Sequence, residues 1–236
     1  MRSLATRADE PEWMDGDDVD PADFAACLAD LAEVNTVTLG RPPTLAFVGR
    51  AARRAERGRA LTILDVGFGD GDMLRAIHRW AARRTRPVRL IGIDLNPRSA
   101  PAARARTPAA MAIDYRTGDA FALPEQEPVD IVLSSLVAHH MADAEVVRFL
   151  RWMEGRARLG WFVNDLHRHP VAYHGFAAMA AVRRWHRFVR HDGPLSVARG
   201  FRRADWRRLL AQAGVEGATI RWHFPFRYGV GRLRCA

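Results

Sequence analysis

A short apolar run that ends in alternating glycines constrains the fold of this chain more than any other feature. Residues 61–66 (Leu-Thr-Ile-Leu-Asp-Val) are mostly apolar, which is typical of a strand buried on both faces of a parallel sheet. The run Gly67-Phe-Gly-Asp-Gly71 follows. Glycines allow a tight turn and let a ligand approach the backbone closely. Residues 73–84 then show helical spacing, so the sequence predicts a strand, a ligand-binding loop and a helix with free N–H groups at its start.

The alternation of strand and helix continues after this loop. Four further apolar runs predict strands, at residues 88–93, 111–115, 129–134 and 159–163. Helical spacing falls between them at 101–107 and 144–157, which is typical of a parallel sheet with helices on both faces. Two more strands are expected at 218–224 and 226–230. The expected fold is therefore α/β, with a doubly wound, mostly parallel, Rossmann-like sheet of seven strands.

Three regions are expected along the chain. Residues 1–19 are polar and acidic and predict a flexible tail. Residues 20–58 predict an N-terminal helical cap, with Asp20 as the N-cap residue before a proline. Residues 59–236 would then form the main domain.

A helical insertion is expected after the fifth strand, at about residues 170–200. The segment from Val171 to about Arg190 has helical spacing with many basic and aromatic residues, and His191-Asp-Gly-Pro194 is expected to break it. An insertion in this position predicts a lid over the edge of the sheet.

The charge of the chain is uneven. All 36 basic Lys/Arg residues are arginines, and the formal net charge is +9. Residues 1–34 hold ten acids and two arginines, a formal −8, so the remainder carries +17. A basic body of this size is typical of proteins that bind nucleic acid, an anionic membrane surface or an anionic substrate. The N-terminus lacks the apolar segment of a secretory signal, and no apolar run approaches membrane-spanning length, so we expect a cytoplasmic protein.

Acids follow the next two predicted strands, at the edge where the glycine loop lies. Asp94 comes directly after the second strand, where a carboxylate can accept hydrogen bonds from both hydroxyls of a ribose. Gly118-Asp-Ala120 follows the third strand, where an acid and a backbone amide can hold an adenine edge. The loop differs from the dinucleotide fingerprint because its third glycine comes one residue early.

The motifs LDVGFGDG, GIDLNP, TGDA and DIVLSSLVAHH, in this order, resemble the class I S-adenosylmethionine (SAM)-dependent methyltransferases over about residues 60–165. The resemblance implies SAM as cofactor and S-adenosylhomocysteine (SAH) as product. It implies that Asp65, Gly67 and Gly69 line the methionine end of the cofactor, that Asp94 holds the ribose, and that Asp119 and Ala120 hold the adenine. The complete expected cofactor site is Asp65, Gly67, Phe68, Gly69, Gly71, Asp94, Leu95, Asp119, Ala120 and Ser135.

Histidines cluster after the fourth and fifth strands. His139 and His140 follow the fourth strand, and His167 and His169 follow the fifth. Because imidazole titrates near neutral pH, a histidine at this edge of the sheet is a suitable proton acceptor. We expect His139 to be the general base, with His140 as the alternative and His167 orienting the substrate. Asp165 is expected to set a histidine tautomer, and no metal is expected.

The histidine segments also carry finer resemblances. The spacing from Asp130 to His139 is similar to that of small-molecule O-methyltransferases, and the arrangement of Ser135 before the histidine pair resembles the ubiquinone/menaquinone-type methyltransferases. The stretch from Asn164 to Pro170 looks like methyltransferases of bacterial type III polyketide synthase clusters, enzymes of secondary metabolism. These resemblances imply O-methylation of a phenolic or enolic hydroxyl on a small aromatic, polyketide-like or lipid-tailed acceptor.

Several alternatives stay open. The same histidine would serve C-methylation of a quinol-type ring. A second class is an RNA or protein methyltransferase, because arginines alternate with aromatic residues between Phe176 and Arg208. That segment also fits a lid touching an anionic membrane surface, or an ordinary solvated helix face. No Asn-Pro-Pro-aromatic motif or cysteine follows the fourth strand, so we do not expect nucleic acid as a partner. A cofactor-binding protein without turnover, and either a monomer or a homodimer, remain compatible with the sequence.

Overall fold

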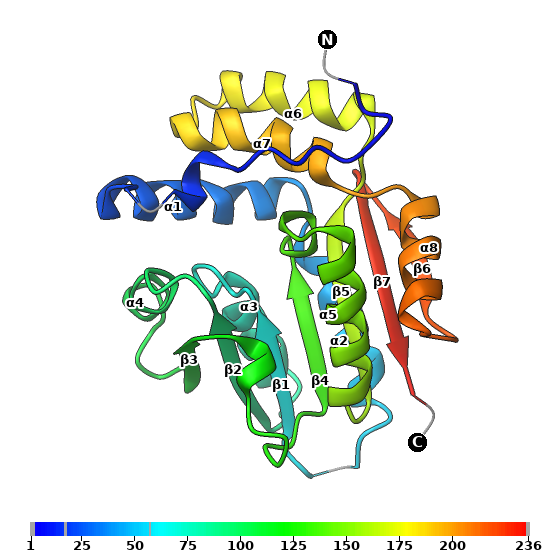
Figure 1. The fold of residues 1–236 in the computed structure, drawn as a ribbon. Helices are drawn as coiled ribbons and strands as arrows, with labels where there is room; N and C mark the ends of the chain where they lie inside the picture. The colour runs from blue at the N-terminus through cyan, green and yellow to red at the C-terminus, as the bar shows by residue number, and fades with distance from the viewer. Residues whose placement is uncertain (1–2, 17, 57, 235–236) are drawn as a thin grey trace.

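The computed structural model describes residues 3–16, 18–56 and 58–234. Its centre is one seven-stranded sheet in the order β3-β2-β1-β4-β5-β7-β6 (Figure 1). The strands are β1 (Leu61–Val66), β2 (Val88–Asp94), β3 (Ile113–Thr117), β4 (Ile131–Ser135), β5 (Gly160–Leu166), β6 (Thr219–His223) and β7 (Arg227–Leu233). The first five are parallel, and β7 runs antiparallel to both β5 and β6. The expected doubly wound, mostly parallel sheet is therefore confirmed.

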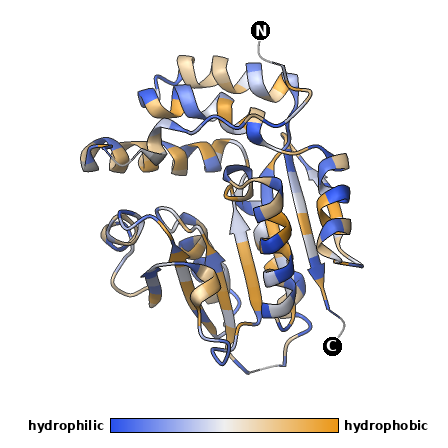
Figure 2. Ribbon diagram, viewed as in Figure 1, coloured by the Kyte–Doolittle hydropathy of each residue, from blue (hydrophilic) through white to orange (hydrophobic). Residues whose placement is uncertain are grey.

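Helices cover both faces of this sheet. One face carries α2 (Arg41–Ala52), α3 (Asp72–Ala82) and α4 (Ser99–Ala105), and the other carries α5 (Asp143–Arg156) and α8 (Arg203–Ala213). All six residues of β1 are buried because both of its faces are covered. Apolar residues accordingly dominate the central strands in Figure 2, whereas polar residues lie along the outer helices.

A third group of helices lies across the carboxyl ends of β1 and β4 (Figure 1). It consists of α1 (Pro21–Val37), α6 (Pro170–Val182) and α7 (Arg187–Arg199). Their facing apolar side chains form a separate small core that includes Cys27, Val34, Trp185 and Phe188. The lid expected at about residues 170–200 is thus a pair of helices that pack with α1.

The break inside this lid was predicted in the wrong place. Helix α6 ends at Val182, and Arg184 adopts a left-handed conformation with φ of 54°. His186 then caps α7, its ring nitrogen accepting a hydrogen bond from the N–H of Phe188. The expected breaker, His191-Asp-Gly-Pro194, lies inside α7. Pro194 has no N–H to donate to the carbonyl of Arg190, four residues earlier in the helix, yet α7 continues to Arg199.

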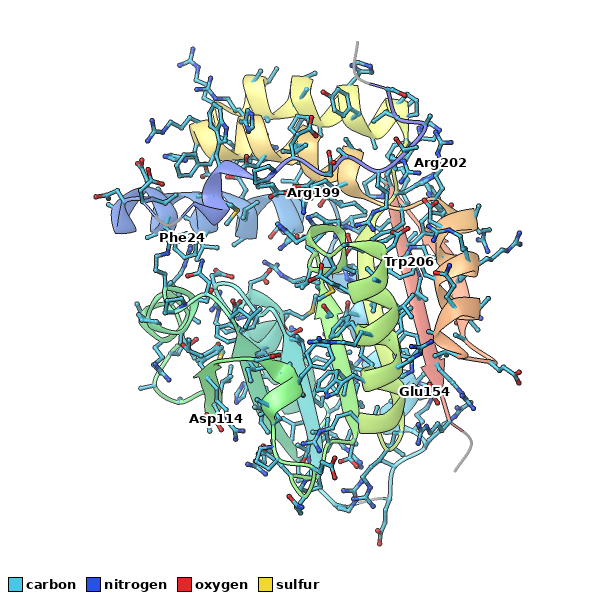
Figure 3. The ribbon with its side chains drawn as sticks, in the orientation of Figure 1. Phe24, Asp114, Glu154, Arg199, Arg202 and Trp206 are labelled. Atoms are coloured by element: carbon cyan, nitrogen blue, oxygen red, sulfur yellow. The ribbon has the colours of Figure 1, made fainter. Side chains whose placement is uncertain are left out.

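The expected N-terminal cap divides between two layers. Helix α1 belongs to the lid, whereas α2 packs on the sheet against α3 and β5. Helix α1 begins where predicted, with the side chain of Asp20 accepting from the N–H groups of Ala22 and Asp23. Phe24 on α1, labelled in Figure 3, lies under the guanidinium of Arg98 at the start of α4.

The acidic N-terminal segment packs along the lid instead of extending away as a loose tail. Its described part includes a short 3-10 helix, η1 (Trp13–Asp15). The N–H of Ala8 donates to the carbonyl of Ala198 at 3.1 Å, and the N–H groups of Trp13 and Met14 donate to the buried Asp192 carboxylate. Residues 1, 2 and 17 of the predicted tail lie outside the described residues.

The acids of the N-terminal half neutralise part of the arginine-rich lid. Asp23 pairs with Arg187 at 2.5 Å, and Glu33 pairs with Arg183 at 2.8 Å. Acids of the same chain therefore neutralise these two arginines, which accounts for part of the uneven charge of the sequence. Within the described residues, no helix has the length and apolar character needed to cross a membrane.

Candidate active site

A cavity of about 560 Å³ lies between the glycine loop and the helical lid. Its floor is formed by the loop after β1 and by the turn after β4, which contains the 3-10 helix η3 (Ala138–His140). Its roof is largely apolar and comes from α1, α6 and α7, with side chains such as Leu28, Leu31, Phe176, Met179 and Val189. The cavity therefore joins a polar floor, at the ends of the strands, to an apolar roof.

The glycine loop adopts the turn that the sequence predicts. Gly67, Gly69 and Gly71 have φ angles of 71°, 56° and 76°, a region that side chains other than glycine rarely occupy. At Gly67 a Cβ would also lie 2.3 Å from Cγ2 of Val137. At Gly69 the nearest atom to a Cβ is Cδ2 of Leu28, 4.0 Å away across the cavity. The loop thus leaves open space at the position where a ligand would contact its backbone.

Two polar groups on the floor have no hydrogen-bond partner among the described residues. Oδ1 of the buried Asp65 and Oγ of Ser135 make no hydrogen bond, and both residues line the cavity. Burial, together with the neighbouring Asp72 and Asp94, raises the pKa of the Asp65 carboxyl well above its usual value. A cationic donor beside this carboxyl would compensate its burial. An unpartnered acid beside an open glycine loop fits the ammonium group at the methionine end of SAM.

The residues expected to hold the ribose and adenine lie at the carboxyl ends of β2 and β3. Oδ2 of Asp94 accepts from the N–H of Gly69, and its Oδ1 accepts from the N–H of Asn96, both at 2.9 Å. Asp119 accepts from Phe121 at the start of the 3-10 helix η2 (Ala120–Ala122). Asp94, Leu95, Asp119 and Ala120 are absent from the cavity lining, and Gly71 serves as the N-cap of α3. Asp94 therefore braces the glycine loop. Asp94 and Asp119 lie at the same edge of the sheet, at the ends of the neighbouring strands β2 and β3.

His139 forms a buried pair with Asp165. Its Nδ1 lies 2.7 Å from Oδ1 of Asp165, and its backbone N–H donates to Oδ2 of the same carboxylate at 3.2 Å. Burial raises the pKa of Asp165, but His139 and the N–H of Leu166 more than offset this effect and leave the pKa below its usual value. An ionised Asp165 accepts the proton on Nδ1, so neutral His139 keeps its lone pair on Nε2. The pair therefore has the geometry of an oriented general base.

Glu12 brings the N-terminal segment to these histidines. The buried carboxylate of Glu12 lies 3.7 Å from Nε2 of His139 and 3.9 Å from Nε2 of His140, and it accepts from the hydroxyl of Ser196 at 2.7 Å. One ligand atom from each of Glu12, His139 and His140 falls within 4.8 Å of the others, so these side chains have the spacing of a three-residue metal site. No motif marks this acid, which is one of ten acids in the first 34 residues.

Two arginines fix the histidine turn against the lid. Arg199, labelled in Figure 3 where α7 approaches the strand ends, donates to the carbonyls of His139 and His140 at 3.0 and 2.9 Å. Arg7 donates to the carbonyls of His139 and Met141 and pairs with Asp143. These contacts hold the candidate base in one position relative to the roof of the cavity.

His167 does not reach the cavity. Its ring packs edge-on against Tyr228 at 4.7 Å and near His169 at 5.3 Å, and the backbone N–H of His167 donates to the carbonyl of Phe226. Burial, with contributions from His169 and Arg202, lowers the pKa of His167 to about 4. His167 is therefore a neutral packing residue in this structure, because the side chain that follows the end of β5 turns away from the cavity lining.

Comparison with known proteins shows a similarity to methyltransferases over part of the chain. Residues 63–160 match the family model described as a methyltransferase domain. The match spans less than half of the chain and shows that this segment is similar to methyltransferase domains. The glycine loop, most of β1 and all of β2, β3 and β4 lie within the matched residues.

One curated relative and several solved structures resemble the chain. It is 32% identical over 120 residues to the ubiquinone biosynthesis O-methyltransferase of Chelativorans sp. (strain BNC1), which covers 49% of this chain but 45% of that protein. The chain thus spans less than half the length of that curated relative. Human N-acetylserotonin methyltransferase in complex with SAM superposes with a TM-score of 0.64 at 17% identity, over 92% of this chain and 57% of that one.

Another solved structure superposes over nearly its whole length. The plantazolicin methyltransferase BpumL in complex with SAH has a TM-score of 0.61 at 11% identity, over 92% of this chain and 96% of that one. The methyltransferase domain of the citrinin polyketide synthase has a TM-score of 0.57 at 15% identity, over 80% of this chain and 51% of that one. At these identities the superpositions show the shared fold.

Proposed function

We propose that this protein transfers the methyl group of SAM to a hydroxyl of a small aromatic or polyketide-like acceptor, with His139 as the general base. The observation that carries the proposal is the 2.7 Å contact between Nδ1 of His139 and the ionised Asp165, on the floor of a largely apolar cavity. The match to a methyltransferase domain and the curated O-methyltransferase relative support the same reaction class.

The chain's own residues would perform three tasks. The apolar roof holds the aromatic or aliphatic body of the acceptor and excludes water from the reacting hydroxyl. Nε2 of His139 accepts the proton of that hydroxyl, while Asp165 holds the ring in the required orientation and stabilises the imidazolium. SAM, when bound in the glycine loop, supplies the electrophilic methyl group. Alignment of the hydroxyl oxygen with this methyl accounts for much of the rate enhancement, about 7–11 kcal/mol in favourable cases.

The same arrangement also serves C-methylation of a quinol-type ring, since removal of a ring hydroxyl proton makes the neighbouring ring carbon nucleophilic. An RNA or protein acceptor has less support. Arg183, Arg187 and Arg208 are engaged by Glu33, Asp23 and Asp143, which leaves fewer free cations for phosphate groups. A weak dependence of affinity on salt would be expected for any RNA that binds.

A comparison of four variants tests the proposal. His139→Ala is expected to lower kcat on the order of 10²–10⁴-fold with phenolic acceptors, because proton transfer loses its acceptor. Asp165→Asn is expected to lower kcat on the order of 10²-fold, because an amide no longer enforces the tautomer. Calorimetric binding of SAH checks that both variants retain the cofactor site.

His140→Ala and His167→Ala are the matched controls, and each should retain at least a tenth of wild-type kcat. Full turnover by His139→Ala with normal SAH affinity would refute the assignment of His139. Loss of turnover in His140→Ala alone would move the role of base to the neighbouring ring.

A further inference from the structure

Arg227 places a buried cation on the wall of the cavity. It is the first residue of β7, lies opposite Leu166 in the sheet register, and is 3% exposed. It lines the cavity together with the preceding residues Pro225 and Phe226. No motif in the sequence marked it, because arginine is the commonest charged residue of this chain.

The guanidinium of Arg227 is incompletely paired. Its Nη2 donates to Oγ1 of Thr38 at 3.0 Å and to Oδ1 of Asn35 at 3.4 Å, and its buried Nε has no hydrogen-bond partner in the part of the chain that the structure describes. Within residues 3–16, 18–56 and 58–234, no carboxylate forms an ion pair with it. A guanidinium carries five N–H donors, and the hydrogen bonds to Thr38 and Asn35 use only those of Nη2.

The two acids whose charges act on Arg227 have other partners. Asp165 contacts His139 at 2.7 Å, and Asp72 pairs with Arg41 at 3.0 Å. Burial lowers the pKa of Arg227 to about 10, while Asp165 and Asp72 act in the opposite direction. The side chain is therefore charged at neutral pH. A buried charge without a counter-ion destabilises the folded chain, and a ligand that supplies the counter-ion recovers that free energy on binding.

We propose that Arg227, held by Asn35 and Thr38, binds a carboxylate group of a ligand in this cavity. A planar guanidinium matches a carboxylate through two parallel hydrogen bonds. The inference rests on the proposed function for the nature of the ligands. The carboxylate belongs either to the amino-acid part of the cofactor or to the acceptor, and the two sources share the same recognition chemistry.

The cofactor is tested first, by binding measurements that require no turnover. Wild type and Arg227→Met are titrated with SAM and with decarboxylated SAM, which lacks the carboxylate alone. If Arg227 binds the cofactor, wild type binds SAM on the order of 10–100-fold more tightly than the decarboxylated compound. Arg227→Met then binds the two compounds with equal affinity.

The acceptor is tested in the same way with SAH present. The probes are 4-hydroxybenzoate and 4-hydroxybenzamide, which differ in the charge of one group. If Arg227 binds the acceptor, wild type prefers the carboxylate by on the order of 10–100-fold, and Arg227→Met loses this preference while its affinity for SAM is unchanged. Arg227→Lys keeps the charge without the two-pronged geometry and should retain part of the preference.

Arg221→Met is the matched control, because Arg221 lies in β6 of the same hairpin, is exposed and does not line the cavity. It should behave as wild type in both titrations. The proposal is overturned if wild type and Arg227→Met prefer the carboxylate compound of a pair to the same extent. It is also overturned if wild type binds both compounds of each pair with equal affinity. If the proposed function fails instead, the SAM titration still reports on Arg227, because binding is measured without an acceptor.

Discussion

Nε2 of His139 lies 3.7 Å from Oε1 of Glu12, although one residue follows β4 and the other belongs to the N-terminal segment. Asp165 contacts the opposite nitrogen of the same ring. The imidazole of the candidate base is thus placed between two buried carboxylates from distant parts of the chain. This arrangement leads to a first prediction about Glu12.

Glu12→Gln should lower kcat about tenfold with little change in KM. The imidazolium formed by proton transfer is stabilised by a nearby carboxylate and not by a neutral amide. Asp9→Asn removes the same charge from an exposed position of the same segment and should leave kcat unchanged. Equal kinetic parameters for Glu12→Gln and wild type would show that this carboxylate serves packing alone.

Treatment with EDTA should leave turnover unchanged if the reaction uses His139 as a base without a metal. The measurement is the initial rate before and after chelation, followed by addition of Zn²⁺, Mg²⁺ or Mn²⁺. Glu12, His139 and His140 have spacing suited to a metal, and Asp165 would orient His139 as a partner of such an ion. If EDTA abolishes activity and a divalent metal restores it, the general-base mechanism is wrong, and a mechanism with a metal-bound acceptor takes its place.

Asp65→Asn should stabilise the protein without ligand and weaken cofactor binding. Burial, with Asp72 and Asp94, raises the pKa of Asp65 in the folded state, so the folded protein loses stability as pH rises above the usual value of that carboxyl. Removing the charge should raise the free energy of unfolding at pH 7 on the order of 1 kcal/mol. Urea unfolding and SAH calorimetry measure the two effects. A variant that is less stable and binds SAH normally would contradict the expected role.

Gly67→Ala should destabilise the fold by about 2–4 kcal/mol. The positive φ disfavours any side chain, and the new Cβ would collide with Val137. Val137→Ala in the same background should recover part of the loss, because it removes the colliding Cγ2 atom. Gly155→Ala is the control, since it lies exposed within α5 with no atom within 4 Å of an added Cβ, and it should be neutral or stabilising. Thermal unfolding compares the variants.

His167 should make the protein less stable in mild acid. Its pKa is about 4 when folded and near 6.5 when unfolded, so the unfolded chain binds the extra proton first. Its contribution to stability is complete above pH 6.5 and is lost as pH falls toward 4. His167→Gln should reduce the loss in free energy of unfolding between pH 7 and pH 5 by about 1–2 kcal/mol, after allowance for partial exposure. Identical pH slopes for the two proteins, measured by urea unfolding, would argue against a depressed pKa.

Local patterns in the sequence were sufficient for the sheet and for much of its carboxyl edge. The apolar runs predicted every strand within a few residues, because a buried strand and an amphipathic helix impose different spacing on neighbouring residues. The glycines predicted the open loop, and the place of His139 after β4 predicted its position on the cavity floor. The break in the lid was misplaced because Gly193-Pro194 is a weaker constraint than the packing of α7 against α1 and α6.

Local sequence patterns predicted a mostly parallel α/β sheet of seven strands and the turn of the glycine loop. The tertiary structure alone decided which charged groups surround the cavity. In the sequence, Glu12 is one of many acids in its segment, and Arg227 is one of many arginines in the chain. His167 follows a strand as His139 does, which predicts that the two act together. Their roles differ because burial and contacts between distant segments set the electrostatic environment of a side chain, and neither quantity is encoded in local spacing.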